Sequence, residues 1–183
     1  FGKEPTSTIN VDEVVALGAS LYAAYKGDRS KLGAAAKASI DKISVKEATS
    51  KCFGTLFMDF DEMVNAWTKK NSVLIQRGDR IPTSITQTFF TMVDYQESIE
   101  LEVTESVSKE EDPRFVKIIW EGNLQLNNPD SVRGGDEVKV TFSYDDNQIM
   151  NCKFQYKEEE SVEVDLSMVD KNDDDGISNI EIL

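Results

Sequence analysis

The chain has 183 residues, of which 39% are hydrophobic and 30% are charged, and its formal net charge at pH 7 is −14. This composition is typical of a globular protein with one core, and so acidic a surface argues against nucleic acid as a partner because it repels phosphate groups. The chain contains no histidine, which excludes Ser-His and Cys-His catalytic machinery and argues against a zinc site. No apolar run is long enough to span a membrane.

Residues 11–26 are predicted to form a helix. Asn10 is a favourable N-cap residue, and Glu13 lies three positions later, where it completes a capping box. Apolar residues then recur at helical spacing along one face, at Leu17, Leu21 and Tyr25. A helix of this length is marginal in water, so this face needs a cover. We expect that cover to come from the rest of the chain or from self-association with a second copy.

Residues 27–30 are predicted to interrupt this helix, with Ser30 as the cap of the next one. Residues 31–42 are rich in alanine, and a second helix is expected there.

From residue 50 onward the apolar residues recur with a period of two, which is typical of half-buried antiparallel strands. Turn residues separate these runs, as in the sequence Arg133-Gly134-Gly135-Asp136. Cys52 and Cys152 each lie in an apolar run, so they are interpreted as small buried residues rather than as a disulfide. The pattern predicts a mainly β fold, an antiparallel β-sandwich preceded by a helical arm, with strands expected at 98–105, 115–120, 137–142, 149–154 and 161–166.

Residues 59–67 leave two alternatives open. Asp59 and Glu62 have the spacing of a capping box, and apolar residues follow at helical spacing, which favours a short helix. An elongated hairpin between two strands is the other interpretation of the same residues.

Several motifs resemble one protein family. Residues 1–5 read Phe-Gly-Lys-Glu-Pro, residues 81–83 read Ile-Pro-Thr before Gln87 and Phe89, and Arg133-Gly134 precedes an alternating run at 137–151. Together with the helix start at residues 10–19, these motifs closely resemble the seventy-kilodalton heat-shock chaperone family of the DnaK type. The resemblance runs to about Met168.

The resemblance implies a division of the chain into four parts. Residues 1–29 correspond to the last helix of the family's nucleotide-binding domain, 30–48 to a lengthened linker, 49–168 to the substrate-binding β-sandwich, and 169–183 to an acidic tail. Because the chain begins at Phe1, it is expected to be a fragment without ATPase activity, whereas the parent protein would use ATP and Mg²⁺. The family's helical lid is expected to be missing, so a bound peptide should leave quickly.

In this family the β-sandwich binds extended apolar peptides in a channel. The positions that the resemblance assigns to the channel are Gly54, Thr55, Phe57, Met58, Phe89, Met92, Ile99 and Leu101. Thr55 replaces a branched aliphatic residue of the family and Phe57 a smaller one, so the channel is expected to be narrowed. The alternative is a sandwich that serves as a protein-interaction module with a partly filled channel and one specific partner.

The resemblance also implies partners. Unfolded or extended peptides are the expected clients, and a J-domain co-chaperone and a nucleotide-exchange factor would act through the parent protein. No membrane partner is expected, and the expected location is the cytoplasm.

Two local features depart from familiar patterns. Gln148 occupies a turn position where the family has glycine, so the hairpin there is expected to differ, since glutamine tolerates a positive φ poorly. The acidic run from Asp170 to Asp175 resembles a calcium loop, but Gly176 lies at its seventh position instead of its sixth. No metal site is therefore predicted in the tail.

Overall fold

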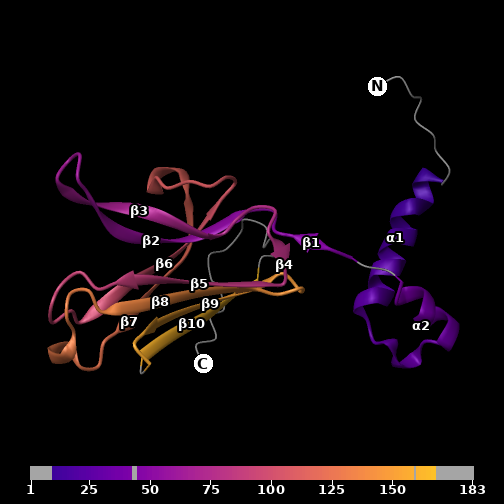
Figure 1. Ribbon diagram of the computed structural model, residues 1–183. Coiled ribbons are helices and arrows are strands. Elements are labelled where there is room, and N and C mark those ends of the chain that lie inside the picture. Colours follow the sequence, from indigo (N-terminus) through magenta and orange to yellow (C-terminus); the bar gives the residue numbers. More distant parts are fainter. Residues whose placement is uncertain (1–9, 43–44, 159, 168–183) are drawn as a thin grey trace, which may run out of the picture. The chain divides into compact units, whose positions relative to one another are not determined.

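Two antiparallel four-stranded sheets pack against each other in the computed structural model of the chain (Figure 1). The structure describes residues 10–42, 45–158 and 160–167. The chain forms two compact units, residues 1–45 and 46–183, and each is described by itself. The mainly β fold, a sandwich that follows a helical arm in the sequence, confirms the predicted fold class.

The first unit contains the helices. Helix α1 spans Val11–Lys26, as predicted, and the Asn10 carbonyl accepts hydrogen bonds from the next turn. The second predicted helix is shorter and later than expected: a 3-10 turn at Arg29–Lys31 precedes α2 at Ala34–Ile40. The cap of the 3-10 turn is Asp28 rather than Ser30, because the Asp28 carboxylate accepts the Ser30 N–H. On α1, the side chains of Leu17 and Leu21 are each 53% exposed in this unit.

The second unit contains the sandwich. One sheet has the order β3-β2-β6-β7 and the other β10-β9-β8-β5, and β1 and β4 form a separate pair. The strands are β1 Glu47–Ala48, β2 Cys52–Asp61, β3 Ala66–Ile75, β4 Arg80–Ile81, β5 Thr83–Phe90, β6 Ser98–Ser106, β7 Lys117–Gln125, β8 Glu137–Tyr144, β9 Ile149–Tyr156 and β10 Glu160–Ser167. Short 3-10 turns lie at Pro113–Phe115 and Pro129–Ser131, so Phe115 precedes β7 instead of starting it.

The core lies between the two sheets. Val103 of β6 and Phe142 of β8 are fully buried there, and aromatic pairs such as Phe53 with Tyr144, at 5.8 Å between ring centroids, join the sheets. Both cysteines are buried and free. Burial raises the pKa of the Cys152 thiol, so this side chain stays neutral and packs as an apolar group.

The structure decides the conformation of residues 59–67, which the sequence left open, and of the turn at Gln148, which was expected to be altered. Residues 59–67 form the end of the β2–β3 hairpin, with Phe60 opposite Trp67, and not a helix. The expectation of an altered turn at Gln148 is wrong in its reason, because Gln148 does adopt a positive φ of 64°. The Asp145 carboxylate holds this turn by accepting the N–H groups of Asn147 and Ile149. The acidic run from Asp170 to Asp175, in which no metal site is predicted, lies outside the described residues.

No helix among the described residues is long and apolar enough to cross a membrane.

Candidate functional site

The sandwich contains a cavity of about 910 Å³ that both sheets line. It is bounded by residues 55–59 of β2, residues 87–90 of β5, the loop that follows β5, and residues 98–102 of β6. The lining also includes three apolar residues of the sheet that contains β5: Val138 and Val140 of β8 and Phe154 of β9. A cavity of this size and lining is typical of ligand-binding sites in proteins.

The cavity exists because β2 and β6 separate. They are paired only over Cys52–Thr55 of β2 and Val103–Ser106 of β6. Beyond Thr55, β2 continues to Asp61 paired with β3 alone, and residues 98–102 of β6 pair with β7. The facing edges of these two strands therefore carry backbone groups that an extended segment could bond, in the manner of an added strand.

Apolar side chains form the floor of the cavity. Leu101 is 3% exposed and packs in the core, and Ile99 lies half-buried beside it. They alternate with outward-facing residues along β6, so both point to the interior of the sandwich.

An aromatic pair narrows the cavity. Phe57 of β2 and Phe89 of β5 come within 5.3 Å between ring centroids. Thr55 is buried nearby, and its hydroxyl donates to the Glu102 carbonyl at 2.8 Å. This side chain is therefore satisfied within the protein, and the apolar part of the lining comes from its neighbours.

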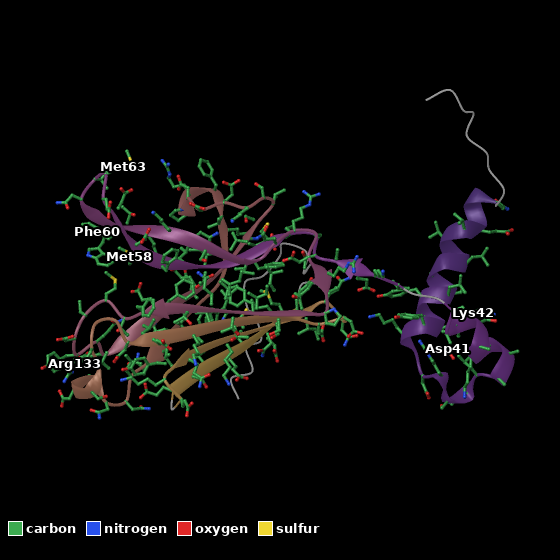
Figure 2. The ribbon with its side chains drawn as sticks, in the orientation of Figure 1. Asp41, Lys42, Met58, Phe60, Met63 and Arg133 are labelled. Carbon is green, nitrogen blue, oxygen red and sulfur yellow. The ribbon has the colours of Figure 1, made fainter. Side chains whose placement is uncertain are left out.

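Two methionines stand at the rim. Met58 on β2 is 38% exposed and Met92 in the loop after β5 is 42% exposed, and both line the cavity. Figure 2 shows Met58 on the hairpin of β2 and β3, farther from the tip of the hairpin than Phe60 and Met63. Flexible thioether side chains adapt to differently shaped apolar groups, which suits a variable occupant.

The loop that carries Met92 is held firmly by the segment before β8. The Thr91 N–H donates to the Asp136 carbonyl at 3.0 Å, and the Gly135 N–H donates to the Thr91 carbonyl at 2.8 Å. The Asp94 carboxylate accepts the Gly134 N–H at 2.9 Å. This wall of the cavity is therefore fixed in position by bonds to a neighbouring loop.

Several polar groups in the lining have hydrogen-bond partners within the protein. Lys69 of β3 donates to Glu102 of β6 at 2.8 Å, across the intervening strand β2. Gln96 in the loop after β5 donates to the Ser98 carbonyl. Within residues 10–42, 45–158 and 160–167, no three potential metal ligands gather in one place. The arrangement suits the binding of an apolar segment.

The structure brings together seven of the eight positions that sequence reasoning assigned to a channel. The lining includes Thr55, Phe57, Met58, Phe89, Met92, Ile99 and Leu101. Gly54 has a different place: it is buried at the β2–β3 pairing, against the Ser72 carbonyl. Trp67, Phe90 and Gln96 also line the cavity and were missed. A correct pairing of β2 with β3 would have pointed to Trp67. This residue lies opposite Phe60, and Phe60 is two positions after Met58.

Comparison with protein families agrees with these features. The family model described as Hsp70 protein matches residues 1–181, nearly the whole chain. The chain belongs to the Hsp70 chaperone family.

Proposed function

We propose that this chain binds extended apolar segments of unfolded polypeptides reversibly, in the cavity between β2 and β6. The observation that carries the proposal is the separation of these strands over a cavity of about 910 Å³ with an apolar floor. Membership of a chaperone family supports the same function.

Each part of the cavity has a role in this proposal. Ile99 and Leu101 receive one apolar side chain of the peptide, and its burial supplies most of the affinity. The facing edges of β2 and β6 bond the peptide backbone, which gives affinity independent of sequence. Met58 and Met92 adapt to the residues on either side.

The proposal includes no ATPase activity and no bound ATP or Mg²⁺ for this chain alone. In the parent protein, nucleotide binding and co-chaperones would regulate the hold on the peptide. Phosphate release by the isolated chain, measured with and without peptide, should stay at the level of a protein-free control.

A peptide panel tests the central proposal. Fluorescently labelled peptides with unrelated sequences, each with a central leucine, are titrated with the chain beside matched peptides in which serine replaces that leucine. Binding of most leucine peptides, and of few serine peptides, is expected. Failure of the whole leucine set to bind would remove the proposal.

The contact of Phe57 with Phe89 favours a second candidate function. A pair of rings at 5.3 Å partly fills the cavity, as expected of an interaction module that uses another surface for one specific partner. Such a module would bind none or one of the panel, and Phe57→Ala would not improve its binding. For a peptide-binding cavity, the same substitution widens the site and should allow bulkier central residues.

A further inference from the structure

The β2–β3 hairpin carries an exposed apolar face beside the cavity. Three exposed side chains of this hairpin are defined here as the hairpin face: Met58, Phe60 and Trp67. They lie on one side of the two strands, because Phe60 pairs with Trp67, and Met58 pairs with Lys69, two positions after Trp67. Their exposed fractions are 38%, 43% and 54%. The Phe60 and Trp67 rings meet edge to face at 5.6 Å between centroids, so the two side chains form one surface.

The hairpin holds this face in a defined position. The Asp61 carboxylate accepts the N–H groups of Met63, at 2.9 Å, and Val64, at 3.4 Å, which closes the turn. Asn65 completes the turn with a φ of 52°. Figure 2 shows Phe60 and Met63 on the part of the hairpin that extends away from the rest of the sheet.

The hairpin face is continuous with the cavity. Met58 and Trp67 belong to both, and Lys69 and Glu102, which lie on the same side of the sheet, also line the cavity. The separation of β2 from β6 therefore opens the cavity towards the side on which Trp67 stands. Ile99 on the floor and Trp67 on the hairpin face therefore line the same cavity.

We propose that the hairpin face is a second apolar subsite for the same peptide, which takes a large aliphatic or aromatic side chain outside the cavity. This inference rests on the proposed function. It specifies the substrate class: extended peptides with two apolar residues separated along the chain, one for the cavity floor and one for Trp67 and Phe60.

The size of the face favours a peptide over a second copy of this chain. A stable protein–protein interface buries about 800 Å² on each partner, drawn from about 20–30 residues. The hairpin face has three side chains, which is enough to cover one or two residues of a peptide. Aromatic side chains in such positions often dominate binding energy.

Peptides with one and two apolar anchors test the inference. The one-anchor peptide has a single leucine in a polar sequence, and the two-anchor series adds a second leucine two, four or six residues away on either side. Alternate residues of an extended peptide lie about 7 Å apart on the same face, so the series scans the path from the floor to the hairpin. At one spacing, binding about tenfold tighter than that of the one-anchor peptide is expected, which corresponds to about 1.4 kcal/mol.

Variants assign that gain to the hairpin. Phe60→Ser, at a residue outside the cavity lining, should abolish most of the gain and leave one-anchor binding unchanged. Trp67→Ser should also abolish most of the gain, with a smaller loss of one-anchor binding, because Trp67 lines the cavity as well. Phe115→Ser is the matched control, because Phe115 is 66% exposed and lies outside the cavity lining. Thermal melts confirm that each variant is folded. A gain that persists in both hairpin variants, or no gain at any spacing, overturns the subsite.

Tryptophan emission reports peptide binding to the hairpin face in the wild-type chain, without any substitution. A two-anchor peptide of the right spacing should shift the emission of the wild-type chain to shorter wavelength, and Trp67→Phe should remove the shift. An unchanged emission at saturation also overturns the subsite. If the one-anchor peptide binds but no spacing adds affinity, only the subsite fails; if no peptide binds at all, the proposed function fails with it.

Discussion

Gly54 occupies a position in β2 that has no room for a side chain. A Cβ atom there would meet the Ser72 carbonyl oxygen and would lie 2.9 Å from Oδ1 of Asn71. Asn71 is itself buried, and its Oδ1 accepts the Thr104 hydroxyl at 2.6 Å. This close approach joins β3 to β2 at the point where β2 starts to separate from β6.

Gly54→Ala should therefore destabilise the sandwich by roughly 1–3 kcal/mol, as overpacking of a core does. Urea unfolding followed by far-UV circular dichroism measures the loss. Gly18→Ala is the matched control, because a Cβ at Gly18 in α1 meets no atom within 4 Å, and unfolding of the sandwich should be unchanged. Equal stability of Gly54→Ala and the wild type would contradict this prediction and would show that β3 can shift away from β2 at little cost in free energy.

Asp136 links the start of β8 to the end of β9. The Tyr156 hydroxyl donates to its carboxylate at 2.7 Å, the Arg133 N–H at 2.9 Å, and Lys157 forms an ion pair with it at 3.0 Å. These bonds, the one from Tyr156 foremost, lower the pKa of Asp136 from its ordinary value of 3.8 to about 2.

A lowered carboxyl pKa sets the direction of the pH effect. The folded state favours the ionised form, so its stabilisation is fully present above about pH 4 and is lost as the pH falls towards about 2. We predict that Asp136→Asn lowers the free energy of unfolding at pH 6 and that the difference from the wild type shrinks between pH 4 and 2. Urea unfolding across this range checks it, with exposed Asp130→Asn as control. A difference that does not depend on pH would contradict the assignment.

At the scale of elements, the loop between β5 and β6 is the fixed wall of the cavity. The bond from the Gly134 N–H to Asp94 is one of several that hold it. Asp94→Ala should speed amide hydrogen exchange at Gly134 and at Tyr95, whose N–H donates to the Val132 carbonyl, and leave β8 and β9 protected.

Binding should report the same change. Because a mobile wall must be ordered again when a peptide binds, Asp94→Ala should also weaken peptide affinity by about twofold to tenfold, an entropic cost of about 0.5–1.5 kcal/mol. Glu97→Ala removes an exposed carboxylate from the same loop and should change neither exchange nor affinity. Faster exchange across the whole sandwich would instead indicate global destabilisation.

The β2–β3 hairpin shows why sequence periodicity left its alternatives open. Phe60 and Trp67 are seven residues apart, a spacing that places two side chains on one face of a helix. The same two residues face each other across an antiparallel hairpin whose turn lies midway between them. Local spacing cannot separate these cases, and pairing with the rest of the sheet decides between them.

For the whole molecule, strands with one buried face were predictable because their side chains alternate, as in β6, β8 and β10. The candidate site was found through a family resemblance, since Ile99 and Leu101 alone resemble any sandwich core. The separation of β2 from β6 depends on pairings between residues about 50 positions apart, such as Thr55 with Val103, and no local pattern encodes it. Gln148 was misjudged for a similar reason: hydrogen bonds from its turn to Asp145 support a φ that propensity disfavours.

Occupation of the cavity floor is the central claim, and one titration tests it most directly. Ile99 lines the cavity, whereas Ile118 on β7 is 38% exposed and lies outside it. A labelled leucine peptide is titrated with Ile99→Phe and with Ile118→Phe, after melts confirm that both are folded, since overpacking at Ile99 costs about 1–3 kcal/mol. We predict that Ile99→Phe loses binding and Ile118→Phe binds as the wild type does; wild-type affinity in a folded Ile99→Phe variant would contradict the claim.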